Sequence, residues 1–345
     1  MGNKVYMLQQ LNSCNLFTNQ IFTFANYSMV DSLREQWLLL LSTPVYFIII
    51  GLELLLSHIG HRKAYTTKDT FTNLYLMLLN SGIDFVFRFI YLAIFQYFFL
   101  HAVMQWHNAV LYWVILLLAE DFLYYWLHRF DHEIRFFWAT HVTHHSSEKL
   151  NFSVGFRSSV FQPLYRFIYF IPLAWIGFKP LDIVFMYSAT QIWGIFVHTE
   201  MIDKMGWLEY ILITPSHHRV HHASNAKYLD KNMGMFLVLW DKLFGTFQPE
   251  LPAENYQPIK YGLTKNIDKP NAVTIVFHEW KQMWKDVFQK KISLHDRVGY
   301  LFGPPGWSHD GSRMTSEEMR EKEATKYDAP GLEKDLHSAS FIEVT

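Results

Sequence analysis

The chain has 345 residues and a mass of 41.0 kDa; 50% of its residues are hydrophobic, 18% are aromatic and 18% are charged. This composition excludes a mostly disordered chain, and the near balance of 30 Lys and Arg with 31 Asp and Glu excludes a nucleic-acid partner bound through a basic face. The single cysteine, Cys14, excludes an internal disulfide framework and metal sites built from cysteines, which leaves the 18 histidines as the unusual feature.

Apolar runs recur between residues 36 and 199 and predict an all-α, integral membrane protein. They cover residues 36–57, 72–103, 108–127, 160–178 and 181–199. A spanning helix needs about 20 residues, and several runs reach that length only by including charged groups. Asp84 and Arg88 are four residues apart, so they can neutralise one another on a helix. We expect a helical bundle of four or five membrane segments, in which residues 163–199 fit a re-entrant hairpin equally well.

The basic residues predict which side of the membrane each loop occupies. Arg62, Lys63 and Lys68 lie in the loop 58–69, which the positive-inside rule places in the cytosol. The segments that follow return 128–158 and 200–250 to that same side, where the histidine clusters lie. We therefore expect a site facing the cytosol, in the endoplasmic reticulum of a eukaryote or the inner membrane of a bacterium.

Composition divides the chain into four parts. Residues 1–35 form an N-terminal extension without a signal-peptide pattern, and 36–250 form the membrane domain. Residues 251–302 are predicted to form an amphipathic, surface-lying helical segment, because Trp280, Lys281, Trp284 and Lys285 alternate there. Residues 303–345 are rich in Gly, Pro, Ser and charge, so we expect a polar, disordered tail without catalytic residues.

Nine histidines stand at spacings that bring imidazoles together. They form an H-x3-H motif, two H-x2-H-H motifs and one isolated position: His128, His132, His141, His144, His145, His198, His218, His221 and His222. On a helix, residues three and four apart share a face. Neutral imidazole suits iron, zinc and copper, and this many ligands exceed the need of one ion. The spacing predicts two neighbouring metals.

Two other metal chemistries fit the motifs less well. A zinc protease needs H-E-x-x-H, but His132 and Glu133 are not followed by a second histidine at that spacing. A bis-histidine haem needs only two axial ligands and gives no reason for two H-x2-H-H motifs.

The motifs resemble those of the membrane di-iron fatty-acid hydroxylase/sterol desaturase superfamily. The stretches FWATHVTHHSSEKLN, FVHTEMID, LEYILITPSHHRVHHASN and YLDKNMGMFLVLWDKLFGTF are similar to the alkylglycerol monooxygenase branch, which uses tetrahydrobiopterin and acts on ether lipids. The resemblance is strong over residues 110–250. It implies that the eight motif histidines, with His198 as a ninth ligand, hold two iron ions and that O2 is the co-substrate.

Two carboxylates are further site candidates. Asp121 lies seven residues before His128 on the same helical face, so we expect it to fix an imidazole tautomer; an ion pair with an arginine is the alternative. The resemblance matches Glu133 to a glutamate associated with activity and pterin use, which makes it a candidate pterin contact or acid. An ion pair with Arg129, four residues away, competes with that role.

The resemblance implies hydroxylation of a lipid C–H bond, with ether-bond cleavage of alkylglycerols as the leading reaction and a substrate that enters from the bilayer. The rival within the superfamily is a sterol, fatty-acid or carotenoid hydroxylase or desaturase that receives electrons from a ferredoxin or cytochrome partner. The rival outside it is a non-catalytic membrane protein that binds metal or haem.

Overall fold

The computed structural model describes residues 29–61 and 64–327, and this part of the chain is helical, with two isolated β-bridges and no named strand. The α-helices are α2 (Met29–Ile59), α3 (Thr67–Leu100), α4 (Ala109–Glu133), α5 (Arg135–His145), α6 (Phe167–Trp175), α7 (Pro180–Phe196), α8 (Pro215–His221), α9 (Leu239–Phe244), α10 (Ala272–Val287), α11 (Leu294–Phe302) and α12 (Ser316–Tyr327). Short 3-10 helices lie at Val154–Phe156, Gln162–Leu164, Gly206–Tyr210 and Ala226–Tyr228. The predicted all-α class is confirmed.

Three of the described helices are long and apolar enough to cross a membrane: Leu40–Ile59, Thr67–Leu100 and Ala109–Glu133. Their outer faces expose large apolar side chains, and Phe47 and Phe89 are 75% and 71% exposed. Water would penalise such a surface, whereas lipid tails accept it. The remaining predicted segments, 160–178 and 181–199, form shorter helices instead.

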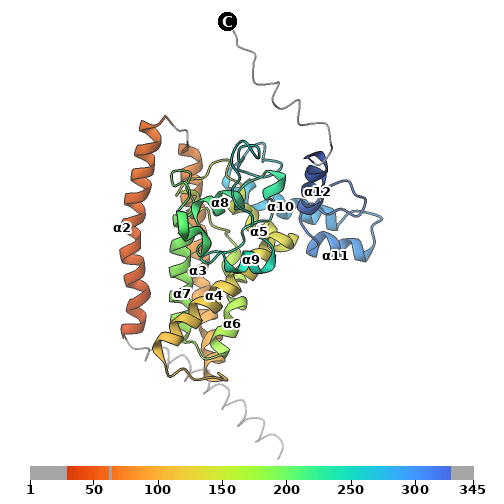
Figure 1. Ribbon diagram of the computed structural model, residues 1–345. Coiled ribbons are helices and arrows are strands. Elements are labelled where there is room, and N and C mark those ends of the chain that lie inside the picture. The colour runs from red at the N-terminus through yellow and green to blue at the C-terminus, as the bar shows by residue number, and fades with distance from the viewer. Residues whose placement is uncertain (1–28, 62–63, 328–345) are drawn as a thin grey trace, which may run out of the picture.

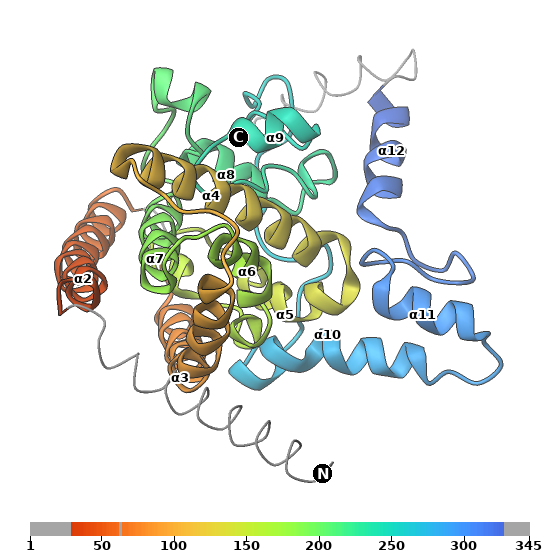
Figure 2. The ribbon, with the colours of Figure 1, turned by 90° about the horizontal axis from the view of Figure 1, so that it is seen from below.

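Helices α6 and α7 make a hairpin that packs inside the bundle (Figures 1 and 2). The turn between them requires Gly177, whose φ is +94° and where a Cβ would lie 2.4 Å from the carbonyl oxygen of Met104. Apolar side chains of α3, α4, α6 and α7 form the largest buried cluster, which includes Phe95, Leu116, Leu173 and Ile183. Helix α2 packs against the outer side of α7.

The predicted pairing of Asp84 with Arg88 is confirmed, with an oxygen–nitrogen distance of 3.0 Å. Arg166, which precedes α6, also donates to Asp84. One carboxylate shared by two guanidinium groups lowers the cost of burying charge within the apolar bundle.

The loop before α3 and the segment after α5 lie at the same end of the bundle (Figure 1), as the sequence predicted for residues 58–69 and 128–158. Asn151 donates to the carbonyl oxygen of Ala64 over 2.7 Å. Arg157 is 1% exposed and donates to Asp69 over 2.9 Å. Arg62 and Lys63, part of the expected cytosolic loop, lie outside the described residues.

Helix α10 is amphipathic, as predicted for 251–302. Ile275 and Met283 are buried, whereas the charged side chains of Lys281 and Lys285 are exposed. Its buried face packs against α5, and Arg135 of α5 donates to Glu279 over 2.7 Å.

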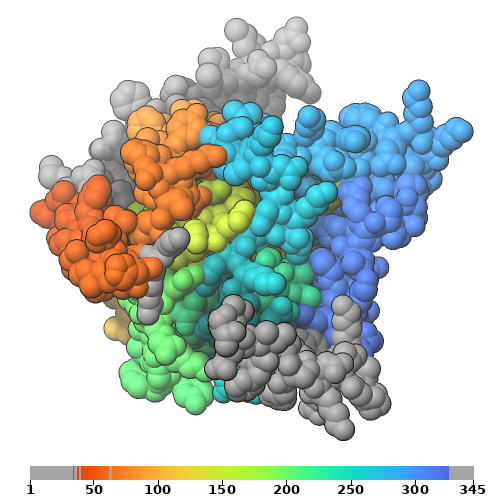
Figure 3. Space-filling view, turned by 90° about the horizontal axis from the view of Figure 1, so that it is seen from above, coloured from red at the N-terminus to blue at the C-terminus, as the bar shows by residue number. Residues whose placement is uncertain are grey.

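The expected disorder of the tail is wrong for residues 303–327. Gly303 accepts a hydrogen bond from the backbone N–H of Arg135 (3.0 Å), and α12 packs against the 3-10 helix Ala226–Tyr228. The carboxylate of Glu323 accepts from the backbone N–H of Lys227 over 2.8 Å and from the Tyr256 hydroxyl over 2.7 Å. These polar contacts, together with the packing of Trp307 on Tyr300, order a segment that is rich in charged residues. Seen from above, the C-terminal segment lies on the side opposite to α2 (Figure 3).

Glu53 interrupts the apolar run of α2, yet it is 2% exposed. Its carboxylate accepts from the backbone N–H of Phe152 over 2.9 Å and from the hydroxyl groups of Thr199 and Tyr65. It therefore joins α2 to the segments that follow α5 and α7.

We predict that Glu53→Leu destabilises the protein by at least about 2 kcal/mol, because several buried donors lose their acceptor. The melting temperature in detergent should fall by several degrees. Glu53→Gln keeps one carbonyl oxygen as an acceptor, so its melting temperature should fall less than that of Glu53→Leu. Equal melting temperatures for Glu53→Leu and the parent would contradict this role.

Candidate metal centre

Four segments deliver the nine predicted histidines to one place. Helix α4 carries His128 and His132 in its last turns, and α5 carries the first H-x2-H-H motif. His198 follows the end of α7. Helix α8 begins with Pro215 after the capping residue Thr214, and its last turn carries the second H-x2-H-H motif up to the C-cap His222.

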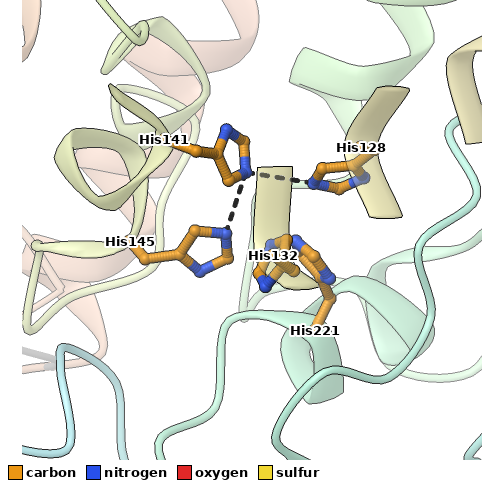
Figure 4. Close-up of side chains that lie close together, drawn as sticks. All are labelled: His128, His132, His141, His145 and His221. Carbon is orange, nitrogen blue, oxygen red and sulfur yellow. Dashed lines mark hydrogen bonds between the residues drawn. The ribbon is translucent and has the colours of Figure 1, made fainter. Parts of the chain in front are cut away.

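The histidines form two groups, and in each group the ligand nitrogens all lie within 4.8 Å of one another. The first group has five members and the second has four: His128, His132, His141, His145 and His221; then His144, His198, His218 and His222. Figure 4 shows the first group, in which rings from α4, α5 and α8 point toward a common centre. Each group could hold one metal ion, as the sequence predicted.

Backbone carbonyls fix the tautomer of four of the rings. The Nδ1 atoms of His128 and His144 lie 2.8 Å and 3.0 Å from the carbonyl oxygens of Met233 and Arg157. Those of His198 and His221 lie 2.6 Å and 3.0 Å from carbonyl oxygens of Gly194 and Lys231. A carbonyl oxygen only accepts, so Nδ1 carries the proton and the neutral ring presents an unprotonated Nε2.

This tautomer makes the centre a cation site. The Nε2 atoms of His144 and His198 face each other at 3.2 Å, and neither carries the proton that would make a hydrogen bond between them. The Nε2 atoms of His132 and His221 are buried and have no hydrogen-bond partner in the described part of the chain. A metal ion satisfies both arrangements, so the residues fit the metal that their spacing predicts.

Burial keeps His144, His145 and His222 neutral. It lowers the pKa of His144 to about 4 and those of His145 and His222 well below their usual range, and neighbouring imidazoles lower the latter two further. A neutral imidazole is the ligating form, so these three residues need no deprotonation at neutral pH to bind a metal.

Two carboxylates stand behind the first group. Asp230 lies 3.3 Å from His132 Nδ1; burial opposes its charge, but His132 and Arg320 bring its pKa below the usual range. Asp131 is fully buried, lies 3.7 Å from His141 Nδ1, and accepts from Gln162 over 2.7 Å. Asp230 orients the His132 ring through this hydrogen bond. Asp131 lies beside the His141 ring without a hydrogen bond to it, and Ser159 Oγ is the partner of His141 Nδ1 at 3.2 Å.

The prediction for Asp121 is wrong. Within the described part of the chain its carboxylate has no hydrogen bond to a histidine or an arginine. It accepts from the backbone N–H groups of Phe236 and Leu237, at 3.0 Å and 3.1 Å, and from the indole of Trp240 at 2.9 Å. These partners come after His222, the last of the motif histidines, so helical spacing within α4 gave no sign of them.

Asp121 nevertheless acts on the centre through the backbone. The loop that it holds begins near Met233, whose carbonyl orients His128. Asp241 holds the same loop by accepting from the N–H groups of Met233 over 2.6 Å and Gly234 over 2.8 Å. Two buried carboxylates thus position one carbonyl oxygen.

Glu133 forms the alternative ion pair with Arg129, at 2.7 Å, and its side chain is 42% exposed. It borders neither of the two cavities beside the centre. Its contact with a pterin stays a prediction.

The first cavity beside the centre has a volume of about 590 Å³ and lies among α2, α3 and α7. Apolar side chains such as Phe47, Leu74 and Met77 form its outer wall. Five of the histidines border it: His128, His141, His144, His198 and His218.

The second cavity has a volume of about 980 Å³ and lies beneath the C-terminal segment. The other four histidines border it: His132, His145, His221 and His222. No histidine borders both cavities, so the metal centre separates an apolar space from a polar one.

Sequence reasoning missed three residues that support the histidines: Asp131, Asp230 and Arg157. Asp131 lies three residues after His128, on the same helical face, and Asp230 belongs to the L-D-K-N block. The sequence positions of both residues could therefore have identified them as candidates. The sequence position of Arg157 could not have identified it, because its partners Asp69 and Asn73 are on α3, far away along the chain.

Comparison with known proteins agrees with this geometry. Residues 113–246 match the family model described as Fatty acid hydroxylase. The chain is 35% identical to an alkylglycerol monooxygenase of Homo sapiens over 81% of its own length and 62% of the relative. The relative of the same name from Xenopus tropicalis is 30% identical over 79% and 60%. The chain thus spans less than two thirds of the length of these relatives, and no solved structure matches it.

We predict that Asp121→Asn lowers the affinity for iron about tenfold, as loss of a group that orients a ligand typically does. Competition with a chelator, followed by iron analysis, measures this. Glu120→Gln is the matched control: this neighbouring buried carboxyl accepts from Thr190 at 3.3 Å and contacts no histidine. Equal iron affinity for Asp121→Asn and the parent would rule out the role of Asp121.

Acid should destabilise the metal-free protein. An unfolded histidine takes up a proton near pH 6.5, whereas the folded pKa of His144 is about 4. The unfolded chain therefore binds more protons between these values, and stability is lost as the pH falls through that window. Melting temperatures in detergent should fall from pH 7.5 to pH 5, and less steeply in His144→Gln. A constant melting temperature would contradict the depressed pKa.

Proposed function

Because residues 113–246 form a domain of the fatty acid hydroxylase family, we propose that this chain is a membrane monooxygenase that holds two irons and hydroxylates a lipid with O2. The observation that carries the proposal is the pair of unprotonated Nε2 atoms of His144 and His198, 3.2 Å apart within a ring of nine buried or half-buried imidazoles. The five-histidine group takes one iron and the four-histidine group takes the other.

When bound, the irons supply the redox chemistry by which dioxygen attacks an unactivated C–H bond. The chain's own residues set the conditions for it. Neutral imidazoles leave the centre more cationic than the carboxylate-rich sites of soluble di-iron bundles. The carbonyls of Met233, Arg157, Gly194 and Lys231 hold Nδ1 protons and so keep the ligand nitrogens directed inward.

The apolar cavity receives the lipid. Its walls come from α2, α3 and α7, so a chain can enter from the bilayer between helices. Polar side chains line it close to the histidines: Ser159 Oγ lies 3.2 Å from His141 Nδ1, and Asn80 donates to the Ser159 carbonyl over 2.7 Å. An ether lipid carries its reactive carbon next to a polar glycerol. Such a lipid fits head inward, with its alkyl chain toward Phe47 and Leu74.

The substrate class follows from the named relatives, which are alkylglycerol monooxygenases. One oxygen atom of O2 enters the ether carbon, and the hemiacetal collapses to a fatty aldehyde and glycerol. The other oxygen atom leaves as water. Tetrahydrobiopterin supplies the two electrons and two protons and leaves as dihydrobiopterin. The centre faces the cytosol, on the side of the basic loop 58–69.

The test uses detergent-purified protein loaded with ferrous iron and a labelled alkylglycerol. We expect fatty aldehyde in the presence of tetrahydrobiopterin, little without it, and a fall of at least about a hundredfold in His144→Ala, because a ligand is lost. Hydroxylated or desaturated products from a lipid extract, supported by a ferredoxin or cytochrome, would favour the rival enzyme class. A protein loaded with two irons that consumes no O2 with any lipid would overturn the monooxygenase.

A further inference from the structure

The polar cavity beneath the C-terminal segment has the properties of a ligand site. Its volume of about 980 Å³ lies at the upper end of the range for small-molecule pockets. Four of the nine histidines border it, so a bound molecule lies within reach of the metal centre. None of these four borders the lipid cavity, so the two spaces meet the centre separately.

More charged side chains line this cavity than line the lipid cavity, where Arg166 is the one charged side chain besides the histidines among the described residues. Its side chains come from α5, the loop 262–268, α10 and the segment before α12, and include Arg135, Asp230, Asn266, Glu279, Gln282 and Arg313. Charged and polar side chains interact more favourably with a polar ligand than with an alkyl chain. The ligand is therefore polar and reaches the centre from water.

Arg135 supplies a fixed donor at the cavity wall. Its side chain is 2% exposed and is held by Glu279 at 2.7 Å and Asp286 at 2.8 Å. Its Nη1 atom is buried and has no hydrogen-bond partner within the described residues. A carbonyl oxygen of a ligand would satisfy this donor, and the carboxylates of Asp230 and Glu279 accept from ligand N–H groups.

A flat aromatic wall lies beside these groups. The Trp138 indole borders the cavity and also packs on the rings of His132 and His145, with centroids 5.2 Å and 5.7 Å apart. His132 and His145 line the same cavity, so a planar heterocycle that packs against Trp138 would lie near two metal-binding imidazoles. Together with the donors and acceptors, this wall fits a ring system with a carbonyl and several N–H groups.

The segment that follows α11 forms the roof. Pro305, Met314 and Met319 line the cavity from that side. The roof is fastened by Arg313, which binds Asp286 at 2.8 Å, and by Arg320, which donates to the Leu229 carbonyl over 2.8 Å. A roofed space of this kind suits a free small molecule better than a cofactor carried by a partner protein.

We propose that this cavity binds the reductant, a reduced pterin, so that electrons and lipid reach the metal centre from different sides. The inference rests on the proposed function, because only an oxygenase needs a reductant there. The pterin gives up two electrons and two protons as it becomes a dihydropterin; the C–H bond supplies the other two electrons that reduce O2 to a hydroxyl group and water.

The test narrows each cavity in turn. Met319→Trp fills the polar cavity from its roof, and Met77→Trp fills the lipid cavity. Glu321→Trp, at an exposed position of the same helix α12, is the matched control. Equilibrium dialysis under nitrogen measures tetrahydrobiopterin binding to each iron-loaded protein, and iron analysis shows that each variant retains its metal.

We expect Met319→Trp to raise the Kd and KM for tetrahydrobiopterin about tenfold or more, since a filled cavity excludes its ligand, with the KM for alkylglycerol little changed. Met77→Trp should raise the KM for alkylglycerol and leave the Kd and KM for tetrahydrobiopterin little changed. Glu321→Trp should have the same Kd and KM values as the parent protein. Pterin binding that is equal in Met319→Trp and Glu321→Trp overturns the inference, and so does an iron-loaded parent that binds no pterin. If Met319→Trp weakens pterin binding but the parent protein releases no aldehyde, the pterin site is supported and the alkylglycerol reaction is ruled out.

Discussion

The rest of the structure depends on imidazole nitrogens that face one another with no proton between them. The Nε2 atoms of His144 and His198 are 3.2 Å apart, and each is left unprotonated because a backbone carbonyl holds the proton of Nδ1. Such an arrangement is unfavourable without a cation, and burial prevents water from relieving it. The fold therefore brings together nitrogen atoms that repel one another when no metal is bound and that jointly bind a metal ion.

Backbone carbonyl oxygens direct four of the nine rings, so the position of the backbone strongly affects the geometry of the centre. Buried charges fix that backbone: Asp121 and Asp241 hold the loop around Met233, and Arg157 is tied to α3 through Asp69. Each charge lies in an apolar bundle where it would be costly if it had no partners. The buried ionic groups of this protein thus serve the metal centre from a distance.

Much of the centre could be predicted from the sequence, because ligand spacing is local: the spacing of His141, His144 and His145 on one helix already places them on one face. The all-α class and the apolar helices followed from composition in the same way. The role of Asp121 could not be predicted, since its partners lie more than a hundred residues away along the chain. Helix α12 escaped prediction because polar contacts such as those of Glu323, not an apolar face, hold it in place.

The histidines come from four segments between His128 and His222, so bound metal ions would act as cross-links. An ion in the five-histidine group would join α4, α5 and α8, and an ion in the four-histidine group would join α5, α8 and the end of α7, which closes long loops that the unfolded chain would leave open. Binding free energy then becomes folding free energy, and the stability of this end of the molecule rises with the concentration of free iron. In a cell, iron supply would set how long the protein survives proteolysis as well as how fast it turns over.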